Sequence, residues 1–187
     1  MKTIDFNNLK LELSLKAKNG VDFIFSAGII WVIITIIWTM SFTSYNKSIF
    51  TFMIGGILLP LAFLLSKILK TQWKVKNNPL QPLGLWLNFA QLFYFPFLIF
   101  ILIANPDYFV MTYAIITGAH LFPYAWFYNQ KSYAVFAGLI SIGSMIISIN
   151  IEKENMFYVP LFTSVYLILL GVFLLIFYQR KSKLTLK

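Results

Sequence analysis

The sequence contains no cysteine, which excludes disulfide bonds, thiolate metal sites and a cysteine nucleophile. Histidine occurs once, at position 120, so one chain cannot assemble a bis-histidine haem site or a histidine-rich zinc site. We therefore expect neither a metal nor a cofactor. Charge is also scarce, at 11% of the residues, and none of it lies deep within an apolar segment. This absence argues against a voltage sensor and against an antiporter coupled through an intramembrane carboxylate.

Apolar residues, in contrast, make up 59% of the 187 residues, against about 45–50% in soluble proteins. The mean hydropathy of +0.78 indicates that much of the surface faces lipid. A helix needs about 20 mostly apolar residues to cross the hydrocarbon core. The sequence therefore predicts an all-α polytopic membrane protein, a bundle of six transmembrane helices at residues 21–42, 48–69, 81–103, 108–128, 132–150 and 157–178.

The basic residues predict the orientation of these helices. With the N-terminus inside, the cytoplasmic side holds thirteen of the fifteen basic residues, as positive-inside topology requires: Lys2, Lys10, Lys16, Lys18, Lys67, Lys70, Lys74, Lys76, Lys131, Arg180, Lys181, Lys183 and Lys187. We therefore expect a cell-membrane location with both termini cytoplasmic, an arm at 1–20, a transmembrane domain at 21–178 and a basic tail at 179–187. Membrane orientation explains the net charge of +9, so nucleic acid is not an expected partner.

A polar stripe with helical spacing marks the segment predicted at 108–128: Tyr113, Thr117, His120 and Tyr124. Counting back from the turn at 105–106 places Gln91 at the depth of His120, with Asn88 in the same layer. Amide and imidazole groups need partners in hydrocarbon. We therefore expect these residues, with Trp31, to form a site for a small neutral or aromatic ligand. The alternative is a neutral histidine that only holds the helices together.

Proline positions suggest where the backbone is loosened near this site. Pro123 follows three residues after His120 and removes one helical hydrogen bond, which predicts a bend that opens space beside the histidine. Pro96 is expected to act in the same way in the preceding helix. Asp22, at the start of the first helix, is interpreted as a carboxylate that stabilises a helix N-terminus, with a role in coupling as the alternative.

Small residues form a second stripe, on the helix predicted at 132–150: Ala134, Ala137, Ser141, Ser144 and Ser148. Their spacing of three and four places all five on one face. Small faces allow close approach of helices, and serine hydroxyls bond across the contact. The stripe predicts a helix–helix seam, with a serine-lined pathway as the alternative.

The runs NFAQLFYFPFLIF from Asn88, GAHLFPYAWFYNQKSY from Gly118 to Tyr133 and GIIW from Gly28 carry a resemblance. With them the chain resembles an uncharacterised family of small multi-span membrane proteins from Bacillus-like bacteria. That resemblance implies a membrane location and no particular activity. In architecture the chain is also similar to substrate-binding components of bacterial vitamin transporters, although Ser26, Ala27 and Gly28 depart from the Ala-x-x-x-Ala spacing of their first helix.

Three functions remain open at this point. The first is a small-molecule transporter or a substrate-binding transporter component. The second is a non-enzymatic accessory protein whose partners are the lipid bilayer and a membrane protein or a second copy of the chain. The third is an intramembrane enzyme that modifies a lipid. A cavity that reaches His120 favours the first, a solid core the second, and a nucleophile beside His120 the third.

Overall fold

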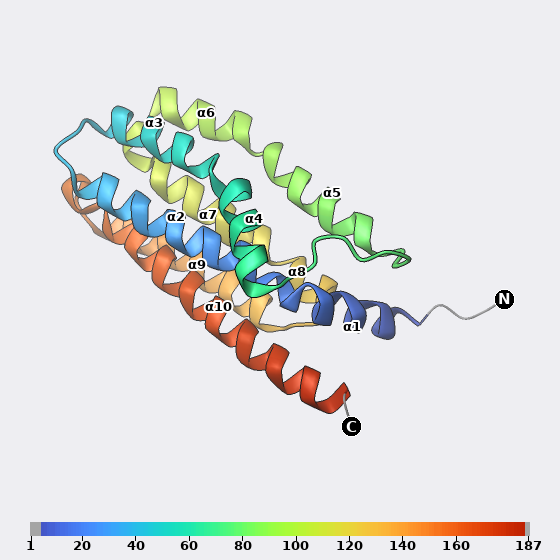
Figure 1. Cartoon of the computed structure of the whole chain (residues 1–187). Coiled ribbons are helices and arrows are strands. Elements are labelled where there is room, and N and C mark those ends of the chain that lie inside the picture. Colours follow the sequence, from blue (N-terminus) through green and yellow to red (C-terminus); the bar gives the residue numbers. More distant parts are fainter. Residues whose placement is uncertain (1–4, 186–187) are drawn as a thin grey trace.

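The computed structural model describes residues 5–185, whose helices run side by side in one elongated bundle (Figure 1). No strand occurs in this part of the chain. The α-helices are α1 (Phe6–Lys16), α2 (Val21–Thr39), α3 (Ser44–Gly55), α4 (Leu58–Leu69), α5 (Gln81–Leu92), α6 (Phe95–Ala104), α7 (Phe109–Leu121), α8 (Tyr124–Phe127), α9 (Ser132–Asn150) and α10 (Tyr158–Thr185). Short 3-10 turns, η1 (Lys18–Gly20), η2 (Pro106–Tyr108) and η3 (Lys153–Asn155), lie between them.

Four helical segments of the described chain are long and apolar enough to cross a membrane: Lys18–Thr39, Gln81–Ala104, Ser132–Asn150 and Lys153–Lys183. A fifth is obtained if α3 and α4, which meet at a bend of 42°, are taken as one span. The span predicted at 108–128 is not one continuous helix, because α7 stops at Leu121 and α8 adds only four residues. The lengths alone therefore show several candidate spans and not the predicted six.

Three of the predicted spans are broken, and each break lies at a proline or within one turn before it. The α3–α4 break at Gly56 and Ile57 precedes Pro60, and the α5–α6 break precedes Pro96. The α7–α8 break falls at Pro123. A proline cannot donate to the carbonyl four residues earlier, and its ring crowds that turn. The helix is thus interrupted next to Pro96 and Pro123, where bends were expected, and a bend of 42° before Pro60 is additional.

The bundle is most tightly packed where α2 lies against α10 and where α7 lies against α9. Glycine permits the close approach of α2 and α10, since a Cβ at Gly171 would lie 2.6 Å from the Phe25 ring. Helix α5, in contrast, has no buried residue. The packed helices thus form a solid half of the bundle, and α5 lies loosely along the other half (Figure 1).

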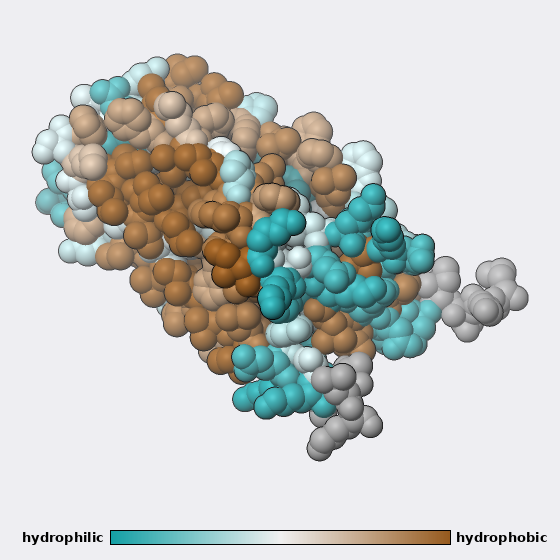
Figure 2. All heavy atoms as spheres, in the orientation of Figure 1, coloured by the Kyte–Doolittle hydropathy of each residue, from teal (hydrophilic) through white to brown (hydrophobic). Residues whose placement is uncertain are grey.

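Helix α1 and the C-terminal part of α10 lie at the same end of the bundle (Figure 1). There Leu13 is buried, and the Lys181 ammonium donates to the Ser14 hydroxyl at 3.0 Å. Figure 2 shows hydrophilic residues gathered at this end and a hydrophobic surface over the middle of the bundle. Residues 6–16 of the predicted arm therefore form a helix that is docked on the bundle. Lys2 and Lys187 of the predicted basic set lie outside the described residues.

Candidate functional site

A cavity of about 710 Å³ lies between α2, the α3–α4 break, α5 and α7. Residues next to all three helix breaks line it, and irregular backbone at membrane depth is tolerated where it lines a cavity. The seven residues predicted as ligand contacts all line this cavity: Trp31, Asn88, Gln91, Tyr113, Thr117, His120 and Tyr124. The structure thus brings them together from α2, α5, α7 and α8. Their role in binding stays a prediction.

The polar centre of the cavity is a short hydrogen-bonded chain. His120 Nε2 lies 3.5 Å from the Tyr124 hydroxyl, which donates to Asn88 Oδ1 at 3.1 Å. The Asn88 amide nitrogen donates in turn to the Gly84 carbonyl at 3.0 Å. This chain joins α7 and α8 to α5 through side chains. It holds the imidazole half-buried beside the cavity, with one ring nitrogen directed to a phenol.

Gln91 lines the same cavity but is not the partner of His120, contrary to the pairing that the sequence suggests. Tyr124 lies four residues after His120, one turn further along α7 and its continuation, so its phenol reaches the imidazole first. Its hydroxyl then meets Asn88, one turn before Gln91 on α5. Counting residues from the turn therefore placed Gln91 beside the cavity, as the structure does. The amide that joins the hydrogen-bonded chain to His120 is instead that of Asn88.

Aromatic rings form the wall of the cavity on the side of α2. The Trp31 side chain is 2% exposed, and its ring lies 5.3 Å from that of Tyr113. The Tyr113 hydroxyl lies against Gly55 at the end of α3, where a Cβ would overlap it. Glycine at the α3–α4 break thus makes room for a tyrosine that faces the cavity. Most of the lining is apolar, with few polar groups.

A carboxylate lies at the end of the cavity closest to α1, and the sequence interpretation did not place it there. Asp22 is 1% exposed and lines the cavity. Its Oδ2 accepts from the Thr71 hydroxyl at 2.8 Å and from the Trp73 indole at 2.6 Å. Trp73, Tyr128 and Tyr133 line the same region. Asp22 is in the first turn of α2, as expected, but it also holds the segment after α4 over the end of the bundle.

The small-residue stripe of α9 lies against two helices. Ser141 donates to the Ile115 carbonyl of α7 at 3.1 Å, and the Ser144 hydroxyl lies 3.3 Å from that of Thr163 in α10. Ser148 donates to the sulfur of Met156 at 3.3 Å. Ala137, Ser144 and Ser148 are buried, and Ala134 and Ser141 are partly buried. The serine hydroxyls therefore have partners in neighbouring elements.

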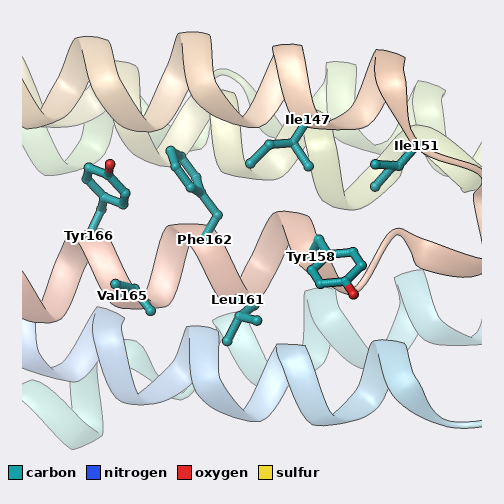
Figure 3. A pocket seen from close by; sticks show the side chains of 7 residues that line it. All are labelled: Ile147, Ile151, Tyr158, Leu161, Phe162, Val165 and Tyr166. Carbon is teal, nitrogen blue, oxygen red and sulfur yellow. The ribbon is translucent and has the colours of Figure 1, made fainter.

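A second hollow, of about 370 Å³, lies between α9 and α10 near their connection (Figure 3). Its lining is apolar and aromatic: Ile147, Ile151, Tyr158, Leu161, Phe162, Val165 and Tyr166. Figure 3 shows Phe162 directed between the two helices, and its ring lies over Gly143. Its side chains offer only two tyrosine hydroxyls as polar groups, too few to orient a polar ligand.

Among the described residues, no three His, Asp or Glu side chains are close enough to hold a metal ion.

Comparison with known proteins gives one match. The model of a family described as a family of unknown function (DUF7010) matches residues 6–177. No curated protein and no solved structure matches the chain. This finding agrees with the predicted resemblance to an uncharacterised family. The Bacillus-like origin and the multi-span nature of that family stay predictions.

Proposed function

The chain belongs to this family of unknown function, and we propose from its cavity that it is a membrane protein that binds a small molecule within the bilayer. The bound molecule is neutral or aromatic, and the protein is a small-molecule transporter or the substrate-binding component of one. The observation that carries this proposal is the cavity of about 710 Å³ lined by all seven candidate residues. Ligand sites in proteins commonly measure about 300–1,000 Å³.

The lining supports a ligand with an aromatic or apolar body. Trp31 and Tyr113 offer ring faces, while His120, Asn88 and Gln91 offer hydrogen bonds without a fixed charge. A mostly apolar pocket with a few convergent polar groups is the usual composition of a small-molecule site. The loosely packed α5 forms one wall of this cavity.

We further propose that the chain crosses the membrane six times with both termini in the cytoplasm. Helix α1 and the end of α10 lie at the same end of the bundle, which requires an even number of crossings (Figure 1). Six is reached when α7, its broken end and α8 are counted with the five candidate spans. The end that carries the termini also holds most of the lysines, as the positive-inside rule predicts for the cytoplasmic side.

The other two functions have less support. An accessory protein without pocket chemistry needs a filled core, whereas the space beside His120 is open. A lipid-modifying enzyme needs a free nucleophile beside the histidine. The hydroxyl next to His120 belongs to Tyr124, a phenol that already donates to Asn88. The site therefore supports binding better than covalent chemistry.

Replacement of His120 by alanine tests the proposal. We expect the purified parent protein to bind 2-phenylethanol, a neutral aromatic probe, in equilibrium dialysis against detergent micelles of matched concentration. His120→Ala should weaken this binding several-fold and leave the thermal unfolding midpoint nearly unchanged. Tyr94→Ala removes an exposed aromatic residue outside the cavity and should leave binding unchanged. Equal binding by the parent and His120→Ala contradicts the proposal, and so does a parent that binds neither 2-phenylethanol nor the 2-phenylethylammonium ion.

A further inference from the structure

Asp22 is a buried carboxylate with one oxygen that has no partner among the described residues. Its Oδ2 is engaged by Thr71 and Trp73, whereas Oδ1 accepts no hydrogen bond. Every fully inaccessible side-chain polar atom of the described chain has a partner, so Oδ1 has accessible surface. Because Asp22 is 1% exposed overall and lines the main cavity, that surface faces the cavity.

The charge of this carboxylate is not neutralised by a basic side chain. The ion pairs within residues 5–185 are Lys16–Glu12 and Lys153–Asp107, and neither involves Asp22. Removing a carboxylate from water without a cation is costly, and two neutral donors offset only part of that cost. The site is therefore electrostatically suited to a cation that enters the cavity.

Several aromatic residues line the cavity together with the carboxylate. The Phe23 and Trp73 rings stack with their centroids 4.8 Å apart, and both residues line the cavity. The rings of Tyr128 and Tyr133, stacked at 6.0 Å, belong to the same lining. Ring faces attract ammonium groups, and this attraction is strongest where water is excluded. A carboxylate among aromatic rings is an arrangement that recognises an organic ammonium ion.

We propose that the ligand of the cavity carries an ammonium group, which binds Oδ1 of Asp22 while its aromatic body extends toward Trp31 and Tyr113. This inference rests on the proposed function and names the class of the ligand, an aromatic amine in its protonated form. The ammonium donates to Oδ1, in the part of the cavity that Trp73 and Tyr128 also line. Thr71 and Trp73 hold the carboxylate in place through Oδ2.

Two probes of nearly equal size separate the contribution of the positive charge to binding from that of the aromatic ring. The 2-phenylethylammonium ion and 2-phenylethanol share the same aromatic body, and only the first is charged at pH 7. We expect the parent to bind the ammonium roughly tenfold or more tightly, as a charge-assisted hydrogen bond to a buried group requires. Equilibrium dialysis against matched micelles measures both affinities. Equal affinities, or a preference for the alcohol, overturn the inference without any variant.

Asp22→Asn removes the charge and keeps an oxygen that accepts from Thr71 and Trp73. This change should abolish the preference for the ammonium, and a thermal unfolding midpoint close to that of the parent shows that the variant is folded. Asp5→Asn is the matched control, because Asp5 is an exposed carboxylate at the start of α1, outside the cavity. If Asp22→Asn retains the preference, Asp22 only fastens the segment after α4. If the parent binds neither probe, the proposed function fails as well.

Discussion

At the scale of single residues, the polar side chains inside the bundle are explained by the partners they reach. An amide or a phenol surrounded by hydrocarbon costs free energy unless it is hydrogen-bonded. Tyr124 meets this requirement by donating to Asn88 while it lies beside His120. The tyrosine is therefore the link between the histidine and α5. The chain orients the imidazole toward the cavity without any formal charge.

Tyr124→Phe tests this link, because it removes the hydroxyl and keeps the ring. We expect the free energy of unfolding to fall by about 1 kcal/mol, the usual net value of one hydrogen bond. Binding of 2-phenylethanol should weaken as well, since His120 loses its neighbour. Thermal unfolding followed by circular dichroism in detergent measures the first effect. Tyr158→Phe removes an exposed hydroxyl and should change neither quantity; an equal loss in both variants refutes the link.

Residue patterns in the sequence predicted the part of the cavity lining around His120 and missed the end around Asp22. Helical spacing placed Tyr113, Thr117, His120 and Tyr124 together, because a stripe on one helix needs no tertiary information. The predicted partner of His120 was wrong, because the side chain that an imidazole reaches depends on rotamers, and residue spacing in the sequence does not reveal rotamers. Asp22 was interpreted locally, because its contacts with Thr71 and Trp73 join residues about fifty positions apart.

At the scale of secondary-structure elements, the main departure from the predicted helices is the breakage of three spans. Hydropathy identifies apolar length but does not register a missing backbone hydrogen bond. Pro96 and Pro123 indicated two of the breaks. The third break, before Pro60, could also have been predicted from the sequence, because Gly55 and Gly56 precede the proline and weaken the same helical turn. Together the breaks make room for the cavity.

The α7–α9 contact gives a test at this scale. A Cβ at Gly118 would lie 2.6 Å from Ser141 Oγ, so the two helices are close together there. Ser141→Leu should overpack this contact and lower the free energy of unfolding by about 1–3 kcal/mol. Met145→Leu, on the exposed face of α9, should have little effect. A leucine at position 141 that is as stable as the parent in a detergent melt would mean that this face is not a packed contact.

At the scale of the whole molecule, charge and apolar surface divide the bundle along its length. The hydrophobic surface covers the middle, and the hydrophilic residues gather where α1 and the end of α10 meet (Figure 2). The sequence predicted this division because both hydropathy and basic residues are read directly from composition along the chain. The described helices give four or five candidate spans where hydropathy predicted six, since α7 is too short to qualify as a span by length.

The orientation has its own test. A reporter that works only in the cytoplasm should be active when it is fused after Lys187, because we propose that the basic end of the bundle faces the cytoplasm. A reporter that works only outside the cytoplasm should be inactive at the same position. A second fusion within the 151–155 connection should report the opposite side. An external C-terminus, or two fusions that report the same side, contradicts the six-crossing arrangement.

If the cavity between α2, α5 and α7 holds a small molecule, native mass spectrometry of gently purified protein should detect it. The parent and Met145→Phe should retain a bound small molecule, whereas Thr117→Phe, which places a ring in the cavity lining, should lack it. A parent without any bound small molecule, or one that Thr117→Phe retains equally, would show that the cavity is not a binding site.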